Sequence, residues 1–116
     1  MKRRKYACAG RRAEPEPFVT PSAFQRSLAG SRPPAECAPA VQALWWAAKG
    51  DWDAAHNIVM AHEDPDCAWV HAHLHRVEGD VDNARYWYRG AGKRPATGAL
   101  EAERDAIVAA LLERPT

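Results

Sequence analysis

Apolar residues recur at intervals of three and four along most of the chain from residue 40 onward, which is the pattern of amphipathic helices. No segment shows instead the alternation of apolar and polar residues that is typical of a half-buried strand. The predicted helices span 41–49, 52–62, 67–78, 81–91 and 99–114. The sequence therefore predicts an all-α domain.

The breaks between these helices carry their own signals. Gly50 and Gly79 stop the first and third helices, and the aspartates that follow them, Asp51 and Asp80, are expected to cap the next helix in each case. We expect Asp66 to cap the third helix, after a break at Pro65. Acidic residues beside the caps are explained by the helix dipole, and no downstream glutamate completes a calcium loop, so we assign them to capping rather than to cation binding.

One unit occurs twice, at a shift of 29 residues: positions 49–56 read Lys-Gly-Asp-Trp-Asp-Ala-Ala-His and positions 78–85 read Glu-Gly-Asp-Val-Asp-Asn-Ala-Arg. This unit resembles the turn of the tetratricopeptide repeat, and Ala84, Tyr88 and Ala91 continue the resemblance. It covers residues 41–95, departs from the usual period of 34, and is weaker in the first copy. It implies two antiparallel helical hairpins, with the helix at 99–114 as a cap.

A second resemblance rests on Ala-Leu-Trp-Trp at 43–46, Lys-Gly-Asp-Trp-Asp at 49–53, Ala-Trp-Val-His-Ala at 68–72 and Asn-Ala-Arg-Tyr-Trp-Tyr-Arg at 83–89. These strings are similar to a family of small bacterial proteins, over residues 36–112. The resemblance implies a bacterial, cytoplasmic protein. It brings no catalytic residues to this chain.

The first forty residues differ in composition from the rest, since they hold six of the nine prolines. Proline removes amide donors and restricts its predecessor, so such a segment does not sustain long helices. We expect residues 1–35 to be a mostly disordered, proline-rich tail. A short amphipathic piece around Ser22–Leu28 is expected to dock Phe24 and Leu28 onto a domain formed by residues 36–116.

Charge is distributed unevenly although the formal net charge is only +1. Residues 1–12 carry six basic and no acidic residues, while residues 13–116 carry ten basic and fifteen acidic ones, a sum of −5. Nucleic-acid binding is therefore expected, if at all, only through the tail 1–12. No apolar run is long enough for a membrane span or a secretory signal. Three widely spaced cysteines fit a reducing cytoplasm better than a disulfide framework.

All five histidines lie between residues 56 and 75. His71 and His75 are four apart and share a face of the third helix, a spacing that holds one metal ion when another element supplies a further ligand. His56 and His62 are the candidates for that ligand, and His73 points away. The alternative is a structural role in which the imidazoles pack between helices and hydrogen-bond to backbone, Trp or Tyr groups.

Cys67 beside a histidine suggests a thiol nucleophile with its base, but no third group or oxyanion site accompanies it in the sequence. We therefore do not assign a catalytic residue, and we expect a non-enzymatic protein.

Aromatic residues are dense between positions 45 and 88, and adjacent ones cannot all face inward. Trp and Tyr beside Arg are the residue types that anchor protein interfaces. The expected binding surface comprises Trp46, Arg85, Tyr86, Trp87 and Arg89. The alternative is that the aromatics enlarge a small core and that the arginines favour the end of their helix.

Together these patterns predict a module that binds a protein partner or a second copy of itself through the aromatic and arginine surface. The alternative function is binding of a divalent metal or a small ligand, with or without catalysis, at His71 and His75 together with His56 or His62. Apart from that possible divalent metal, no cofactor is expected.

Overall fold

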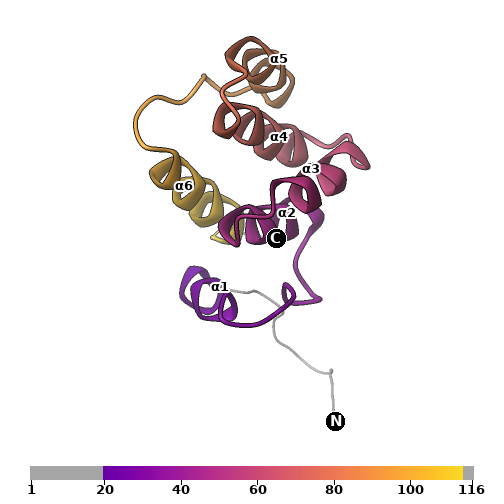
Figure 1. The fold of residues 1–116 in the computed structure, drawn as a ribbon, viewed down its shortest axis with the longest axis vertical. Coiled ribbons are helices and arrows are strands. Elements are labelled where there is room, and N and C mark those ends of the chain that lie inside the picture. Colours follow the sequence, from indigo (N-terminus) through magenta and orange to yellow (C-terminus); the bar gives the residue numbers. More distant parts are fainter. Residues whose placement is uncertain (1–19, 114–116) are drawn as a thin grey trace.

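The computed structural model describes residues 20–113, and residues 1–19 and 114–116 lie outside the described part. The prediction of disorder therefore falls outside the described residues over positions 1–19. Within 20–113 there are six helices and no strand, which confirms the predicted all-α class (Figure 1). The helices are α1 (Pro21–Ser27), α2 (Pro39–Ala48), α3 (Trp52–Met60), α4 (Pro65–Val77), α5 (Val81–Ala91) and α6 (Leu100–Leu112). In this part of the chain no helix is long and apolar enough to cross a membrane.

The turn that occurs twice in the sequence has the same geometry in both copies. Gly50 and Gly79 have φ of 86° and 89°, the left-handed region in which glycine avoids the strain of a Cβ atom. In each copy the aspartate after the glycine donates its backbone N–H five residues back, to Trp46 in the first turn and to His75 in the second, over 2.9 Å. The side chains of Asp51 and Asp80 then cap α3 and α5, as expected.

Helix α4 begins earlier than predicted. Its N-cap is Asp64, whose side chain accepts a hydrogen bond from the backbone N–H of Cys67 over 3.1 Å, so the prediction of a cap at Asp66 is wrong. Pro65 does not break the chain but is the first residue of the helix. The reason is that proline lacks only an N–H that has no helical partner at this position, and its fixed φ suits a first turn.

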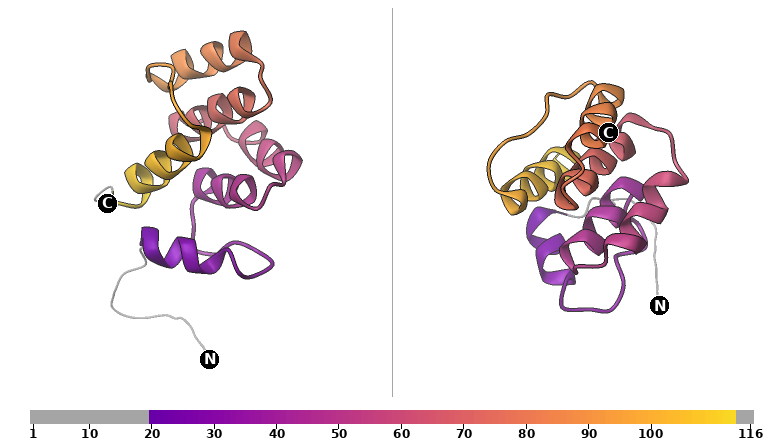
Figure 2. Two further views of the ribbon diagram at one scale, coloured as in Figure 1. Left: turned by 60° about the vertical axis from the view of Figure 1, so that its left-hand side comes forward. Right: turned by 45° about the horizontal axis from the view of Figure 1, so that its top comes forward.

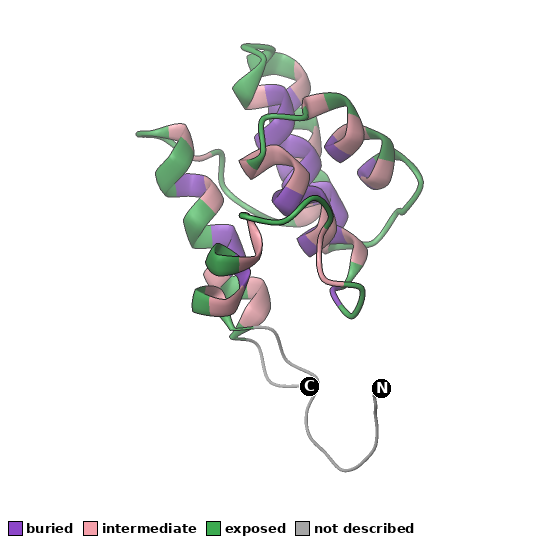
Figure 3. Ribbon diagram, turned by 60° about the horizontal axis from the view of Figure 1, so that its bottom comes forward, coloured by how far each residue is buried: buried purple, intermediate pink, exposed green. Residues whose placement is uncertain are grey.

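Helix α4 is the centre of the molecule (Figure 1). It packs against α2, α3, α5 and α6, and its closest packing is with α5, while α2 packs mainly on α3. This arrangement is compatible with two hairpins, α2 with α3 and α4 with α5. Eight residues of α4 are buried, a larger share than in any helix that lies at the edge (Figure 3).

The main core lies where α2, α3, α4 and α6 meet. Trp45 and Leu44 of α2, Val59 of α3, Val70 of α4 and Ile107 of α6 are all almost inaccessible to solvent. A smaller core between α4 and α5 contains Ala72, Ala84 and Tyr88. The small residues of this second core allow the two helices to approach closely.

Helix α1 docks below α2 and α6, as the sequence predicts for its short amphipathic piece (Figure 2). Phe24 is buried in the main core, and Leu28 packs against it. Ser27 accepts a hydrogen bond from the indole of Trp45 over 2.9 Å, and Lys49 donates to the carbonyl of Leu28 over 2.6 Å. The packed body therefore extends upstream of residue 36, because Phe24 supplies apolar surface that α2 and α6 alone leave uncovered.

Candidate functional site

Three histidine rings meet between α3 and α4. His56 comes from the middle of α3, and His71 and His75 lie one turn apart on α4. One ring nitrogen from each lies within 4.8 Å of one from each of the others, and the Nε2 atoms of His56 and His71 are 3.1 Å apart. His71 and His75 are buried, whereas His56 is half-buried, so the cluster reaches solvent at the His56 ring.

Two tryptophans enclose the cluster. The ring of Trp52, at the start of α3, stacks on His56 with centroids 4.5 Å apart. Trp87 of α5 stacks on His71 with centroids 3.9 Å apart and an angle of 12° between the planes. The indole N–H of Trp52 donates to the carbonyl of Leu74 over 2.7 Å, which fixes its orientation. The three imidazoles therefore lie between two apolar walls that hold them in place.

Glu78 orients the third ring. Its carboxylate lies 2.5 Å from Nδ1 of His75, three residues earlier in the chain. A histidine that gives its Nδ1–H to a carboxylate keeps Nε2 for an ion, and such carboxylate partners are typical of metal-binding histidines in proteins. His56 and His71 already present Nε2 to each other. One of these two Nε2 atoms carries the hydrogen of that bond, and a change of tautomer that moves it to Nδ1 would free both Nε2 atoms for an ion.

The environment favours the neutral form of His71 and His56. Burial, together with the neighbouring His75 and His56 rings, lowers the pKa of His71 from 6.5 to about 4. Burial and the nearby His75 also lower the pKa of His56. Because a histidine binds metal only in its neutral form, these shifts leave each of the two rings with one nitrogen lone pair at neutral pH.

The arrangement fits a divalent transition metal. With Zn–N bonds of about 2.0–2.1 Å, two nitrogens on a tetrahedral ion lie about 3.3 Å apart. The separation between His56 and His71 is close to that value, and the ring nitrogen of His75 lies within 4.8 Å of theirs, so it would have to move closer to reach the same ion. Three imidazoles suit Zn²⁺, Cu²⁺ and Ni²⁺ better than the hard cations Mg²⁺ and Ca²⁺.

The other candidate residues, His62, His73 and Cys67, do not belong to the three-histidine cluster. His62 is exposed beyond the end of α3, so of the two α3 candidates only His56 joins the pair on α4. His73 points away from the cluster, as its position on the helix predicts. Burial and the carboxylate of Asp64 raise the pKa of Cys67 to about 12, so this thiol does not supply a nucleophilic thiolate.

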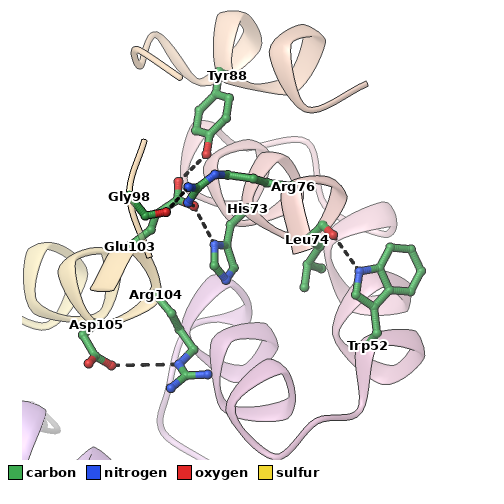
Figure 4. A network of polar contacts seen from close by, with 9 residues as sticks. All are labelled: Trp52, His73, Leu74, Arg76, Tyr88, Gly98, Glu103, Arg104 and Asp105. Carbon is green, nitrogen blue, oxygen red and sulfur yellow. Dashed lines mark hydrogen bonds and ion pairs between the residues drawn. The ribbon is translucent and has the colours of Figure 1, made fainter. Parts of the chain in front are cut away.

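His73 belongs to a second polar network, centred on Glu103 of α6 (Figure 4). The carboxylate of Glu103 lies 2.7 Å from Nδ1 of His73 and accepts hydrogen bonds from Arg76 over 3.0 Å and from the hydroxyl of Tyr88. Burial opposes ionisation of Glu103, but the hydrogen bonds from His73 and Tyr88 outweigh it and lower its pKa. This network joins α4, α5 and α6.

Glu103 is a residue that the sequence predictions missed. A signal was present, because Glu103 falls on the same stripe of its helix as Leu100 and Ile107, where an apolar residue would be expected. A charged residue on a buried stripe requires buried partners, and His73 is the one histidine that the metal hypothesis left without a function.

The predicted aromatic surface is only partly assembled. Tyr86 is 59% exposed, and Arg85 and Arg89 are exposed on the same helix, α5. Trp87 stacks on His71 and is only partly exposed to solvent. Trp46 lies on α2 and packs against the main core. The outer surface of α5 therefore consists of a tyrosine and two arginines, with Val81 exposed at its start.

No protein-family model, curated protein or solved structure matches this chain. The resemblances to the tetratricopeptide repeat and to small bacterial proteins thus stay predictions, and the function is argued from the site alone.

Proposed function

We propose that this protein binds a divalent transition metal, with Zn²⁺ as the reference ion, through His56, His71 and His75. The observation that carries the proposal is that one ring nitrogen from each of these histidines lies within 4.8 Å of the others, across two helices. Glu78 supports it by orienting His75, and the half-buried His56 provides the route by which an ion enters.

A purely structural role explains the cluster less well. Such a role predicts hydrogen bonds from the imidazoles to backbone, Trp or Tyr groups. Among the described residues, however, the hydrogen bonds of these rings run to each other and to Glu78. Nδ1 of His71 is buried with no hydrogen-bond partner there. Burying three imidazoles in this way opposes their hydration, and an ion on the Nε2 atoms would offset part of that cost while leaving Nδ1 of His71 without a partner.

The ion would join α3 to α4 and so tie the first hairpin to the second. Its surroundings favour a stabilising role over a catalytic one, because Trp52 and Trp87 occupy the space beside two of the three ligands. Two free, buried cysteines, Cys37 and Cys67, agree with a reducing compartment such as a bacterial cytoplasm. The proposal is accordingly a metal-stabilised helical protein without enzymatic activity.

Thermal unfolding tests this proposal. At a Zn²⁺ concentration about 100-fold above the dissociation constant, mass action stabilises the folded chain by about 3 kcal/mol, which raises Tm by about 10 °C. The His56→Gln variant should lose this rise, whereas the matched variant His62→Gln, altered at an exposed residue six positions away, should keep it. Equal shifts in both variants, or none in the wild-type protein, would contradict the proposal.

Protein binding through α5 is the second candidate. Tyr86 and Val81 are 59% and 53% exposed, and Arg85 and Arg89 lie beside them. This basic and aromatic surface would suit an acidic partner, and residues 13–116 of a second copy carry a net charge of −5. Sedimentation equilibrium over a range of concentrations tests for self-association. We expect Arg89→Glu to weaken it and Arg26→Glu, on α1, to leave it unchanged; a monomer at every concentration would contradict self-association.

A further inference from the structure

A cavity of about 140 Å³ lies between α2, α4 and α6, on the side of α4 that faces away from the cluster's His71. Trp52, Leu74 and Val77 form its apolar wall. Cavities of about 150 Å³ hold a molecule the size of benzene, so this one has room for a ligand of about six to eight non-hydrogen atoms. Its position explains why Val77, on the apolar stripe of α4, remains partly exposed.

Opposite charges lie at one side of this cavity. Glu101 and Arg104 line it from α6, three residues apart. The nearest carboxylate to the Arg104 guanidinium among the described residues is that of Asp105, at the long distance of 3.9 Å. The guanidinium therefore retains donors for a carboxylate ligand, and Glu101 offers a carboxylate to a cation.

His73 adds a polar atom to the same cavity. Its Nδ1 is held by Glu103, and its second ring nitrogen points away from Glu103, on the side from which Arg104 extends (Figure 4). The cavity thus combines a positive group, Arg104, with a negative group, Glu101, and His73 lies beside them.

We propose that this cavity binds a small zwitterion, namely an α-amino acid with a short branched aliphatic side chain. The carboxylate of the ligand pairs with Arg104, its ammonium pairs with Glu101, and its side chain packs on Trp52, Leu74 and Val77. A simple carboxylate of the same size would meet the like charge of Glu101, and a simple amine would meet that of Arg104. This inference is independent of the metal proposal.

Calorimetric titration of the full chain, with chelator present to remove any metal, tests the inference with three probes of matched shape. These are L-valine, isovalerate (valine without its ammonium) and isobutylamine (valine without its carboxylate). L-valine should bind at least about tenfold more tightly than either of the others, since each lacks one charge-assisted contact.

Variants locate the binding. Arg104→Gln should weaken L-valine binding at least about tenfold, and the matched change Arg85→Gln on α5 should leave it unchanged. Ala47→Leu tests the site without removing a charge, because the larger side chain fills the cavity from α2. The inference is overturned if L-valine does not bind, if isovalerate or isobutylamine binds equally well, or if binding survives in both Arg104→Gln and Ala47→Leu, each checked for native helix content.

Discussion

His71 is the most constrained ring of the cluster. It is only 4% exposed, stacks on Trp87, and shares its Nε2 with His56. Protonation would place a charge in this buried position, next to two other imidazoles, and so the ring keeps its neutral form well below the usual pKa of a histidine.

This shift makes the metal-free protein sensitive to acid. The pKa of His71 is about 4 in the folded chain and 6.5 in the unfolded chain, so between these values the unfolded state binds more protons. The free energy of unfolding should therefore fall by about 3 kcal/mol as the pH drops from 7 to 4. Urea unfolding at a series of pH values, with chelator present, measures this free energy. The His71→Gln variant should show a smaller pH dependence. An equally steep dependence in that variant would assign it to other groups.

Glu103 is the second residue on which the fold depends. Its carboxylate is the common acceptor for groups on two other helices, and replacing one member of a buried ionic network leaves the others uncompensated. Glu103→Gln should reduce the free energy of unfolding by about 3 kcal/mol, measured by urea denaturation. Glu101→Gln, at an exposed position on the same helix, should change it by less than about 0.5 kcal/mol. Similar losses in both variants would show that the network contributes little.

At the scale of the elements, the turns and helices are determined by local sequence. The two Gly-Asp turns have matching hydrogen bonds because glycine adopts a positive φ and aspartate caps the next helix, and both effects act within a few residues. The start of α4 was predicted less well, since Asp64 and Asp66 are both capable caps and only the placement of Pro65 as a first helical residue decides between them.

Helix α1 is the element whose contribution is easiest to measure. Phe24 is its one buried residue and lies in the main core. Truncating a buried phenylalanine removes its transfer free energy and leaves a cavity, so Phe24→Ala should cost about 3 kcal/mol of stability. Gln25→Ala, at the exposed neighbouring position, serves as the control in the same chemical denaturation. If both variants unfold at the same denaturant concentration, α1 is not part of the cooperative unit.

At the scale of the whole molecule, α4 is the helix that packs against α2, α3, α5 and α6. One face carries His71 and His75 toward α3 and α5, and another carries His73 and Arg76 toward α6. The candidate metal site and the Glu103 network are therefore two polar clusters on opposite sides of one helix. Between them they fix α3, α5 and α6 around it.

The sequence predicts the helices and the pairing of His71 with His75, because both depend on spacing within one helix. It leaves His56 and His62 as alternatives, since which one faces α4 depends on how α3 and α4 cross. It also misses Glu103 and the cavity beside Arg104, whose partners lie about 30 residues away in the chain and meet only when α6 folds back onto α4. The position of Glu103 on an apolar stripe indicates that it is buried, but its partners depend on tertiary packing and leave no local pattern.

The most direct test of the proposed metal site is the number of ions that the chain holds. Equilibrium dialysis against Zn²⁺, at a concentration that saturates the site, should give one ion per chain for the wild-type protein and for His62→Gln. It should give none for a variant in which His56 and His71 are both replaced by glutamine and whose helix content is native. Retention of one ion by that double variant, or no ion in the wild-type protein, would contradict a metal site formed by His56, His71 and His75.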